Sequence, residues 1–337
     1  MQYINRNLER VIENYLKIFP VVSVTGPRQS GKSTLLKYKF SSKYKYITFD
    51  DPVQIELFES DPKGFMKNHQ NYTIFDEVQR VPDLFHYLKI EVDNNRSTYG
   101  KYILTGSNQF QINNRITETL AGRIGLLSLL PFQFNEIPKK QRELAIINGC
   151  YPEVVVRNYQ YVREYYAEYI KNYIERDVRS IANIINLRDF QRFVFLLASL
   201  TAQELNMNKI ANEIGITVKT VQHWISILEA SYIIFLLPPY YNNLGKRIVK
   251  RPKLYFYDTG LVCYLTGIRD SDSLRFGPLA GPIFENFIIA DIKKNIFHYN
   301  SDLYLYYFRS NLGLELDLII ENLSEKNAGL YRKLRQD

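Results

Sequence analysis

The sequence predicts an α/β protein that begins with a parallel β-sheet covered by helices and continues into a helical region and a smaller α+β region. Three observations support this fold class. Short apolar runs alternate with helical stretches up to about residue 130, a glycine-rich turn joins the first run to a helix, and longer helical stretches begin near residue 150. Alternating strands and helices favour a parallel sheet, because each crossover helix returns the chain to the same edge.

The composition is typical of a globular chain of two or three domains. The 337 residues are 46% hydrophobic and 23% charged. No stretch approaches the ~20 apolar residues of a membrane-spanning helix, and the first residues do not resemble a secretory signal. Cys150 and Cys263 have no metal or redox spacing. We therefore expect a cytoplasmic protein that is not bound to a membrane. The net charge of +8 permits a nucleic-acid partner without establishing one.

The first apolar run, residues 21–24, leads into a phosphate-binding loop (P-loop) and then a helix. The pattern is Gly26-x-x-x-x-Gly31-Lys32-Ser33. Glycines let successive backbone N–H groups point at a phosphate, and the following helix adds its positive dipole end. Lys32 supplies charge for the terminal phosphates, and the Ser33 hydroxyl can ligate Mg²⁺. The sequence thus predicts an ATP and Mg²⁺ site, whose nucleotide-binding residues are Gly26, Pro27, Arg28, Gln29, Ser30, Gly31, Lys32, Ser33 and Thr34.

The other strands of the predicted sheet end in polar residues, at the edge where parallel sheets bind their ligands. The third of these strands ends in Asp76 and Glu77. In a P-loop enzyme such an Asp holds Mg²⁺, and the Glu can polarise the water that attacks the γ-phosphate, which favours hydrolysis over phosphorylation of a small molecule. A plain strand end is the alternative. The expected elements are helices at 3–19 and 53–70 and strands at 45–50, 72–77, 99–108 and 124–130.

Further residues are candidates for the catalytic site. Ser107 or Asn108, at the tip of the fourth strand, could orient the attacking water, and the alternative is a strand that simply ends in a turn. Arg115 and Arg123 follow, and either could reach a γ-phosphate in its own chain or in a neighbouring one. For each arginine a position on a solvated face is the equal alternative.

The region after residue 150 is predicted to be mainly helical. Residues 207–237 read as a helix–turn–helix, with Gly215 suited to the turn and Thr217 a natural N-cap for the second helix. A basic stretch follows at 246–253, then strands at 303–308 and 314–320. We expect a nucleotide-binding domain at 1–140, a helical region at 150–245, a C-terminal domain at 250–322 and an irregular tail at 323–337.

Together these segments resemble the AAA-type predicted ATPases of bacteria and archaea. The resemblance implies ATP hydrolysis on an AAA+ core, a winged-helix middle part and a C-terminal part akin to restriction-endonuclease-like folds. It rests on Gly-Pro-Arg-Gln-Ser-Gly-Lys-Ser at 26–33, Phe-Asp-Glu-Val-Gln-Arg at 75–80, Leu-Thr-Gly-Ser-Asn at 104–108, Leu-Ala-Gly-Arg at 120–123, and later segments at 131–136, 173–178, 252–261, 281–286 and 315–317.

The C-terminal part departs from this pattern. Endonuclease-like sites hold metal with an Asp on one strand and a Glu-x-Lys on the next. Asp317, with Glu285 and Glu315 nearby, could supply carboxylates, but no Glu-x-Lys follows residue 321. We therefore expect a truncated endonuclease-like fold without nuclease activity.

The sequence leaves three functions open. The favoured one is an AAA+ ATPase, a hydrolase whose nucleotide state moves the C-terminal domains, either alone or as a homo-oligomer. The second is an ATP-regulated protein that binds duplex DNA through the winged helix, where Lys219, Thr220, Gln222 and His223 lie on the second helix. The third is an inactive regulatory remnant.

Overall fold

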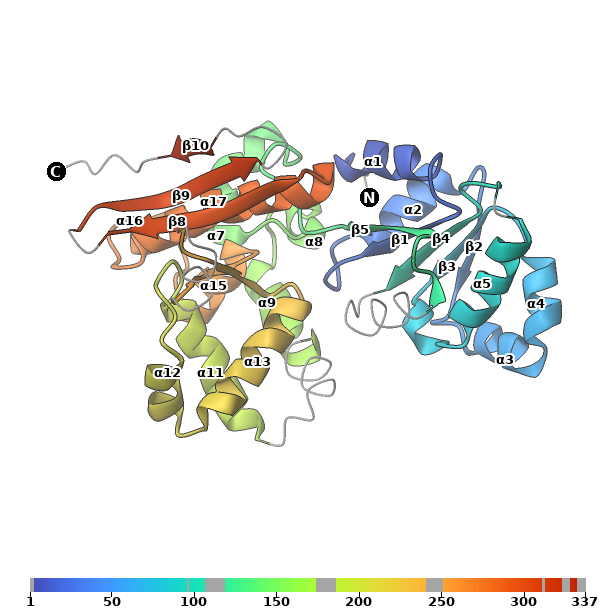
Figure 1. The fold of residues 1–337 in the computed structure, drawn as a ribbon. Helices are drawn as coiled ribbons and strands as arrows, with labels where there is room; N and C mark the ends of the chain where they lie inside the picture. The colour runs from blue at the N-terminus through green and yellow to red at the C-terminus, as the bar shows by residue number, and fades with distance from the viewer. Residues whose placement is uncertain are drawn as a thin grey trace. The chain divides into compact units, whose positions relative to one another are not determined.

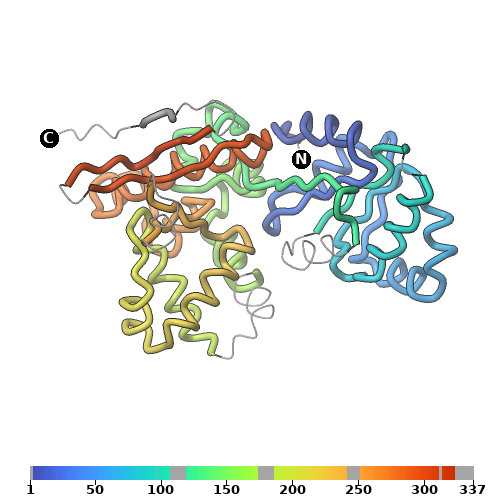
Figure 2. The backbone as a smooth tube through the Cα atoms, in the orientation of Figure 1, coloured from blue at the N-terminus to red at the C-terminus, as the bar shows by residue number. Residues whose placement is uncertain are grey.

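The computed structural model describes residues 3–95, 97–106, 119–173, 186–240, 251–310 and 313–322, together with the backbone of 328–331. The chain divides into two compact units, which Figures 1 and 2 show as ribbon and tube. The first unit is Met1–Leu130 with Phe297–Asn300, and the second is Pro131–Ile296 with Ser301–Asp337. Within the described part of the chain, no helix combines the length and the apolar character needed to cross a membrane.

The first unit contains the predicted parallel sheet. Its five strands are ordered β2-β3-β4-β1-β5, and every neighbouring pair is parallel. Because β1 lies between β4 and β5, the segment that leaves its carboxyl end emerges from an interior strand of the sheet and not from an edge strand. The fold class predicted for this part is confirmed. The strands are β1 Val21–Thr25, β2 Lys45–Thr48, β3 Thr73–Asp76, β4 Tyr102–Gly106 and β5 Ile124–Ser128.

Helices cover both faces of this sheet. One apolar cluster joins the sheet to α1 and α2, and a second joins the opposite face to α3, α4 and α5 (Figure 1). The single helix expected at 53–70 is two helices, because Pro62 starts a new one and the Asp61 carboxylate caps it by accepting from the Gly64 N–H. The helices are α1 Leu8–Tyr15, α2 Lys32–Phe40, α3 Pro52–Ser60, α4 Pro62–Asn68 and α5 Leu84–Asn94.

The second unit starts with helices, as predicted. Gly215 has a φ of 85° between α12 and α13, and the Thr217 hydroxyl accepts from the Thr220 N–H at 3.1 Å, so the predicted turn and N-cap are present. The described helices are α7 Ala145–Asn148, α8 Pro152–Val156, α9 Val162–Tyr169, α11 Leu187–Ser199, α12 Met207–Ile214, α13 Val218–Ala230, α15 Thr259–Thr266, α16 Ser271–Arg275 and α17 Ala280–Tyr299.

Two antiparallel sheets complete the second unit. β6 Ile234–Leu237 pairs with β7 Lys253–Phe256, and β8 Leu303–Arg309 pairs with β9 Glu315–Asn322. The segment expected to be an irregular tail contains a further strand, β10 Ala328–Tyr331, on the free edge of β9. That expectation was wrong because backbone pairing with an exposed sheet edge requires no apolar sequence pattern.

A buried carboxylate ties together three segments of the second unit. Asp258 caps α15 by accepting from the Leu261 N–H at 3.0 Å. It also accepts from the Cys150 N–H and from the Tyr166 hydroxyl, each at 2.6 Å. Next to it, a Cβ on Gly260 would lie 2.4 Å from the Tyr166 hydroxyl oxygen and 2.6 Å from the Gly149 nitrogen, so only glycine lets α15 pack this closely.

Candidate nucleotide and magnesium site

The loop between β1 and α2 has the geometry of a phosphate cradle. Gly26 has a φ of 145°, and a Cβ there would lie 2.1 Å from the Leu129 carbonyl oxygen. Gly31 has a φ of 92° where α2 begins. The loop is held from outside by Arg6, whose guanidinium donates to the Ser30 oxygen at 2.9 Å and to the Leu130 oxygen at 2.7 Å. Sequence reasoning missed Arg6, because it lies 24 residues before its nearer partner.

Lys32 is turned into this loop, and among the described residues its ammonium has no carboxylate partner at hydrogen-bond distance. Its ammonium donates to the Gly26 oxygen at 3.0 Å and to the Pro27 oxygen at 2.9 Å. Burial lowers the pKa of Lys32 to about 8, against the opposing effect of Glu77 and Asp76. Two carbonyls are weak partners for a buried ammonium, so the position suits the oxygens of a phosphate.

Asp76, at the end of β3, is the centre of the second part of the site. It is 3% exposed, and its carboxylate accepts from three hydroxyls. Ser33 donates at 3.0 and 3.2 Å to the two oxygens, Thr105 donates to Oδ1 and Tyr46 donates to Oδ2. A carboxylate beside a serine hydroxyl is a hard oxygen donor set, which fits Mg²⁺.

Thr105 and Tyr46 were not predicted as site residues, although strand pairing explains both. Phe75 pairs with Leu104, so Thr105 is opposite Asp76 on the neighbouring strand. Thr48 pairs with Asp76 on the other side, and Tyr46 lies two residues before it on the same face of β2. A tyrosine side chain is long enough to span that offset. Finding either residue from sequence would have required the order of the strands.

Glu77 follows directly and has a strained backbone. Its φ is 58°, and the Gln79 side-chain amide donates to its carboxylate. The Glu77 carboxylate opposes the lowering of the Lys32 pKa by burial. The structure therefore brings together four of the predicted residues: Lys32, Ser33, Asp76 and Glu77.

Arg123 lies elsewhere. Its guanidinium forms a two-pronged ion pair with Asp93 of α5, with Nε–Oδ1 at 2.7 Å and Nη2–Oδ2 at 3.2 Å. It precedes the first residue of β5, which pairs with Val21 at the start of β1. The length of β1 separates this edge from the loop, roughly 15–20 Å. The expectation that Arg123 reaches the γ-phosphate of its own chain is wrong, because the chain passes it at the amino end of the strands. Ser107, Asn108 and Arg115 lie outside the described residues.

The C-terminal carboxylates form a separate cluster around a lysine. The Lys253 ammonium lies 2.9 Å from Glu315, 3.1 Å from Glu285 and 3.4 Å from Asp317. The Tyr255 hydroxyl also donates to Glu285, at 2.6 Å. Burial disfavours the charge of Lys253, but the carboxylates outweigh it and raise its pKa. Sequence reasoning looked for a lysine after residue 321 and missed Lys253, which comes from β7.

The three carboxylates share the Lys253 ammonium. Among the described residues, no group of three or more His, Cys, Asp or Glu side chains is arranged to hold a metal ion.

Comparisons with known proteins match both parts of the chain. Residues 19–138 match the family model of an AAA domain, and residues 139–272 match that of a domain of unknown function. An uncharacterised protein of Mycobacterium tuberculosis is 29% identical over 305 residues, covering 90% of this chain and 68% of that protein. One of Methanocaldococcus jannaschii is 25% identical over 357 residues, covering 95% and 76%.

Among solved structures, the chain is similar to the Walker-type ATPase Paby2304 of Pyrococcus abyssi. The TM-score is 0.52 at 16% identity, with 78% of this chain and 96% of that one covered. At this identity the likeness concerns the fold.

Proposed function

Because residues 19–138 form an AAA domain with the fold of the P-loop ATPases, we propose that the chain is a Mg²⁺-dependent ATPase that couples its nucleotide state to the second unit. The observation that carries this proposal is the contact between loop and strand end: the Ser33 hydroxyl on the Asp76 carboxylate, with Lys32 held in the loop beside them. This contact supports a phosphate-binding group and a metal-binding group that act side by side.

In this proposal, different residues of the first unit bind the phosphates, hold the metal ion and accept the proton of the attacking water. Backbone N–H groups of the loop 26–31 bind the phosphates, and Lys32 exchanges two carbonyl oxygens for phosphate oxygens. Ser33 and Asp76 would hold Mg²⁺, which supplies charge neutralisation for the phosphates. Glu77 accepts the proton of the attacking water, while Gln79 orients its carboxylate. Thr34 is the remaining predicted contact near the phosphates.

Tyr46 and Thr105 act on the metal site through Asp76. Ser33 spreads its donation over both carboxylate oxygens at 3.0 and 3.2 Å and can turn to a metal. Thr105 and Tyr46 each donate a hydrogen bond to one oxygen of the Asp76 carboxylate. These bonds would keep the carboxylate oriented when the Ser33 hydroxyl turns from Asp76 to the metal. We assign both hydroxyls a positioning role.

A comparison of Glu77→Gln with Glu59→Gln tests the proposal. Gln keeps the size and hydrogen bonding of Glu77 but cannot take a proton, so steady-state ATP turnover should fall by about a hundredfold or more while ATP binding persists. Glu59 is exposed on α3, and its variant should turn over normally. Normal turnover in Glu77→Gln would contradict the assignment. Nucleotide binding without turnover in the unaltered protein would instead favour an inactive regulatory remnant.

A second candidate function is ATP-regulated binding of duplex DNA. Helices α12 and α13 followed by β6 and β7 have the order of a winged helix, which we propose as its DNA-contacting part. Lys219, Gln222 and His223 are exposed on α13, opposite the buried Val221 and Trp224. Duplex binding that weakens steeply with salt, and further in Lys219→Gln, would support this function. The same weak affinity at low and high salt would contradict it.

We also propose that the protein is cytoplasmic and forms a homo-oligomer. In an oligomer, the Arg123 guanidinium could contact the γ-phosphate bound by a neighbouring chain. Arg123→Ala and Asp93→Ala both break the pair between these residues. Only the first should lower turnover if the arginine acts in the neighbour's site. Equal turnover in the two variants would remove Arg123 from the reaction.

A further inference from the structure

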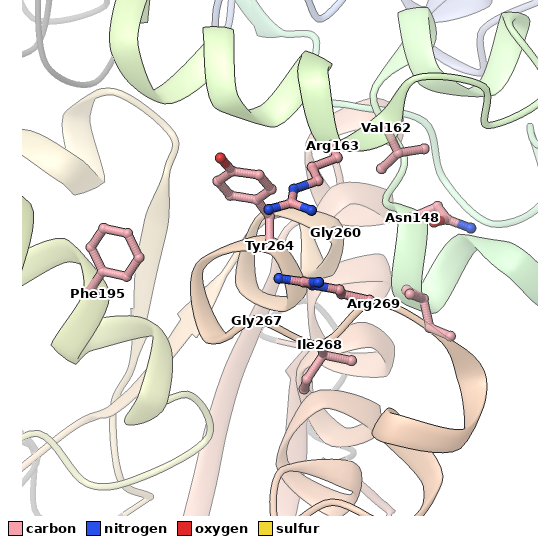
Figure 3. A pocket seen from close by; sticks show the side chains of 10 residues that line it. Asn148, Val162, Arg163, Phe195, Gly260, Tyr264, Gly267, Ile268 and Arg269 are labelled. Carbon is pink, nitrogen blue, oxygen red and sulfur yellow. The ribbon is translucent and has the colours of Figure 1, made fainter.

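We propose that the second unit contains a binding pocket for a small organic anion, a phosphate or carboxylate carried on a flat apolar body. The pocket lies among α7, α9, α11, α15 and the segment that follows α15, and Figure 3 shows it from close by. Its volume is about 300 Å³, at the lower end of the range for small-molecule sites. All of its lining residues fall in the segment that matches a domain of unknown function.

Two arginines give the pocket its charge. Arg163, in the first turn of α9, and Arg269, just after α15, both line the cavity, and in Figure 3 their guanidinium groups extend into the same space beside Tyr264. Neither guanidinium makes an ion pair or hydrogen bond with any residue in the described part of the chain. Glu164 follows Arg163 in sequence and is exposed on α9. Asp270, which follows Arg269, is engaged at the start of α16, where it accepts from the Ser273 N–H at 2.7 Å.

Two cations facing one cavity without a counterion favour an anionic ligand. Their mutual repulsion is relieved when an oxyanion binds between them, and a guanidinium recognises a phosphate or a carboxylate through two parallel hydrogen bonds. Both arginines are solvent-accessible, so the anion can enter without opening the fold. Asn148 also lines the pocket and adds a polar residue to its wall.

The other walls favour a flat apolar body on the ligand. Tyr264 presents its ring to the pocket, and Phe195 on α11 is 47% exposed although the neighbouring Phe193 and Val194 are buried. Aromatic faces bind flat groups by stacking and also gain from the adjacent guanidinium charge. Inorganic phosphate alone would leave these surfaces uncovered.

The floor of the pocket is already formed. Gly260 packs against the turn at 148–149 so closely that a Cβ would meet the Asn148 carbonyl carbon at 2.6 Å. Asp258 secures the same contact from beneath through the Cys150 N–H and the Tyr166 hydroxyl. Binding to a rigid floor costs little reorganisation, so a small ligand can bind measurably.

Fluorine NMR with simple probes tests this site in the full chain carrying Lys32→Ala, which removes the competing P-loop charge. The probes are 4-fluorophenyl phosphate and 4-fluorobenzoate, with 4-fluorobenzyl alcohol as the uncharged analogue. We expect one or both anions to bind and the alcohol to bind at least about tenfold more weakly. Whichever anion binds more tightly identifies the oxyanion that the pocket accepts.

Substitutions then locate the binding. Arg163→Gln and Arg269→Gln should each raise the dissociation constant of the preferred anion by about three- to tenfold, and Arg163→Lys should restore part of the loss. Arg157→Gln is the control, because Arg157 is exposed and already paired with Glu153. The proposal is overturned if neither anion binds at about 5 mM, if the alcohol binds equally well, or if the double Gln variant binds as tightly as the parent.

Discussion

Lys32 is predicted to bind the phosphates of ATP, and in the absence of nucleotide its buried charge should lower the stability of the folded protein. Its ammonium is buried with two carbonyl oxygens as hydrogen-bond partners, and burial lowers its pKa from 10.5 to about 8. At about 1.4 kcal/mol for each pH unit, that difference corresponds to about 3 kcal/mol. We therefore predict that Lys32→Met, which keeps the length of the side chain and removes the charge, stabilises the first unit in the absence of nucleotide.

The sign and size follow from proton linkage. Below pH 8 the lysine is protonated in both the folded and the unfolded chain, so the full cost is present, and it disappears as the pH rises from 8 to 10.5, where the unfolded chain binds more protons. Methionine leaves the Gly26 and Pro27 oxygens without this donor, at about 1 kcal/mol each. The expected net gain at pH 7 is therefore about 1 kcal/mol.

Hydrogen exchange of the buried amides in β1 and β4 is the suitable assay, because the only tryptophan, Trp224, lies in the second unit and does not report on the first. Exchange in Lys32→Met should slow by about fivefold at pH 7, since about 1.4 kcal/mol corresponds to tenfold. Lys63→Met removes an exposed lysine from α4 and should leave the rates unchanged. ATP should slow exchange in the parent and in the control but not in Lys32→Met.

Faster exchange in Lys32→Met than in the parent would refute this reasoning. It would mean that the two hydrogen bonds of the ammonium outweigh its desolvation, so that the lysine is a structural pin of the loop. The reasoning would also be refuted if ATP no longer slowed exchange in Lys32→Met while the exchange rates of the nucleotide-free variant equalled those of the parent. That result would show that burial of the charge costs no stability.

Three further predictions concern the other charged and hydroxyl groups. Tyr46→Phe should raise the dissociation constant of Mn²⁺ in the nucleotide complex by about three- to tenfold, while nucleotide binding without metal is retained. The control Tyr44→Phe loses only the hydrogen bond to the Gly100 oxygen and should leave the Mn²⁺ affinity unchanged. Equal Mn²⁺ affinity in both variants would show that Tyr46 does not act on the metal site. ATP affinity should fall as the pH rises above about 8, because nucleotide-free Lys32 then loses its proton and binding must restore it, and a flat profile from pH 7 to 9.5 would contradict this. Lys253→Met should lower the unfolding free energy of the second unit, measured by Trp224 fluorescence, by about 3 kcal/mol, because it leaves three carboxylates without their cation. Arg309→Met, which breaks the exposed ion pair with Glu204, should change this free energy little. Neither the parent nor Lys253→Met should cleave plasmid DNA with Mg²⁺ or Mn²⁺, and cleavage that is lost in Asp317→Ala would contradict the assignment of the carboxylates around Lys253 as an ion-pair cluster.

The parts of the site that are local in sequence could be predicted, and the parts made by strand order could not. The loop 26–33 and the pair Asp76–Glu77 each lie within one short segment, where residue type and spacing carry the chemistry. Tyr46 and Thr105 reach Asp76 from strands on either side of β3, and only the register reveals that they do. Arg6 reaches the loop from the N-terminal segment for the same reason.

Two errors have related physical causes. Arg123 follows the predicted site residues closely in sequence, but it precedes its strand, and residues before and after a strand lie at opposite edges of the sheet. Lys253 was overlooked because a lysine was sought only on a strand after the three carboxylates, whereas an earlier strand supplies the ammonium. Sequence reasoning predicted the sheet from short apolar runs that alternate with helical stretches, and it could not predict which distant charged side chains meet on that sheet.

The Asp258 carboxylate has a consequence for the order in which the second unit assembles. Its partners Cys150 and Tyr166 precede it by 108 and 92 residues. During synthesis, α7, α8 and α9 therefore emerge long before the residue that fixes them, and the chain must close a large loop before that contact can form. Until then the Cys150 N–H lacks its acceptor and the Tyr166 hydroxyl has only the Asn148 oxygen, and the apolar faces that later bury them stay accessible to other chains. We expect aggregation during refolding to be decided at this step, with the helices before residue 200 forming early and waiting for α15.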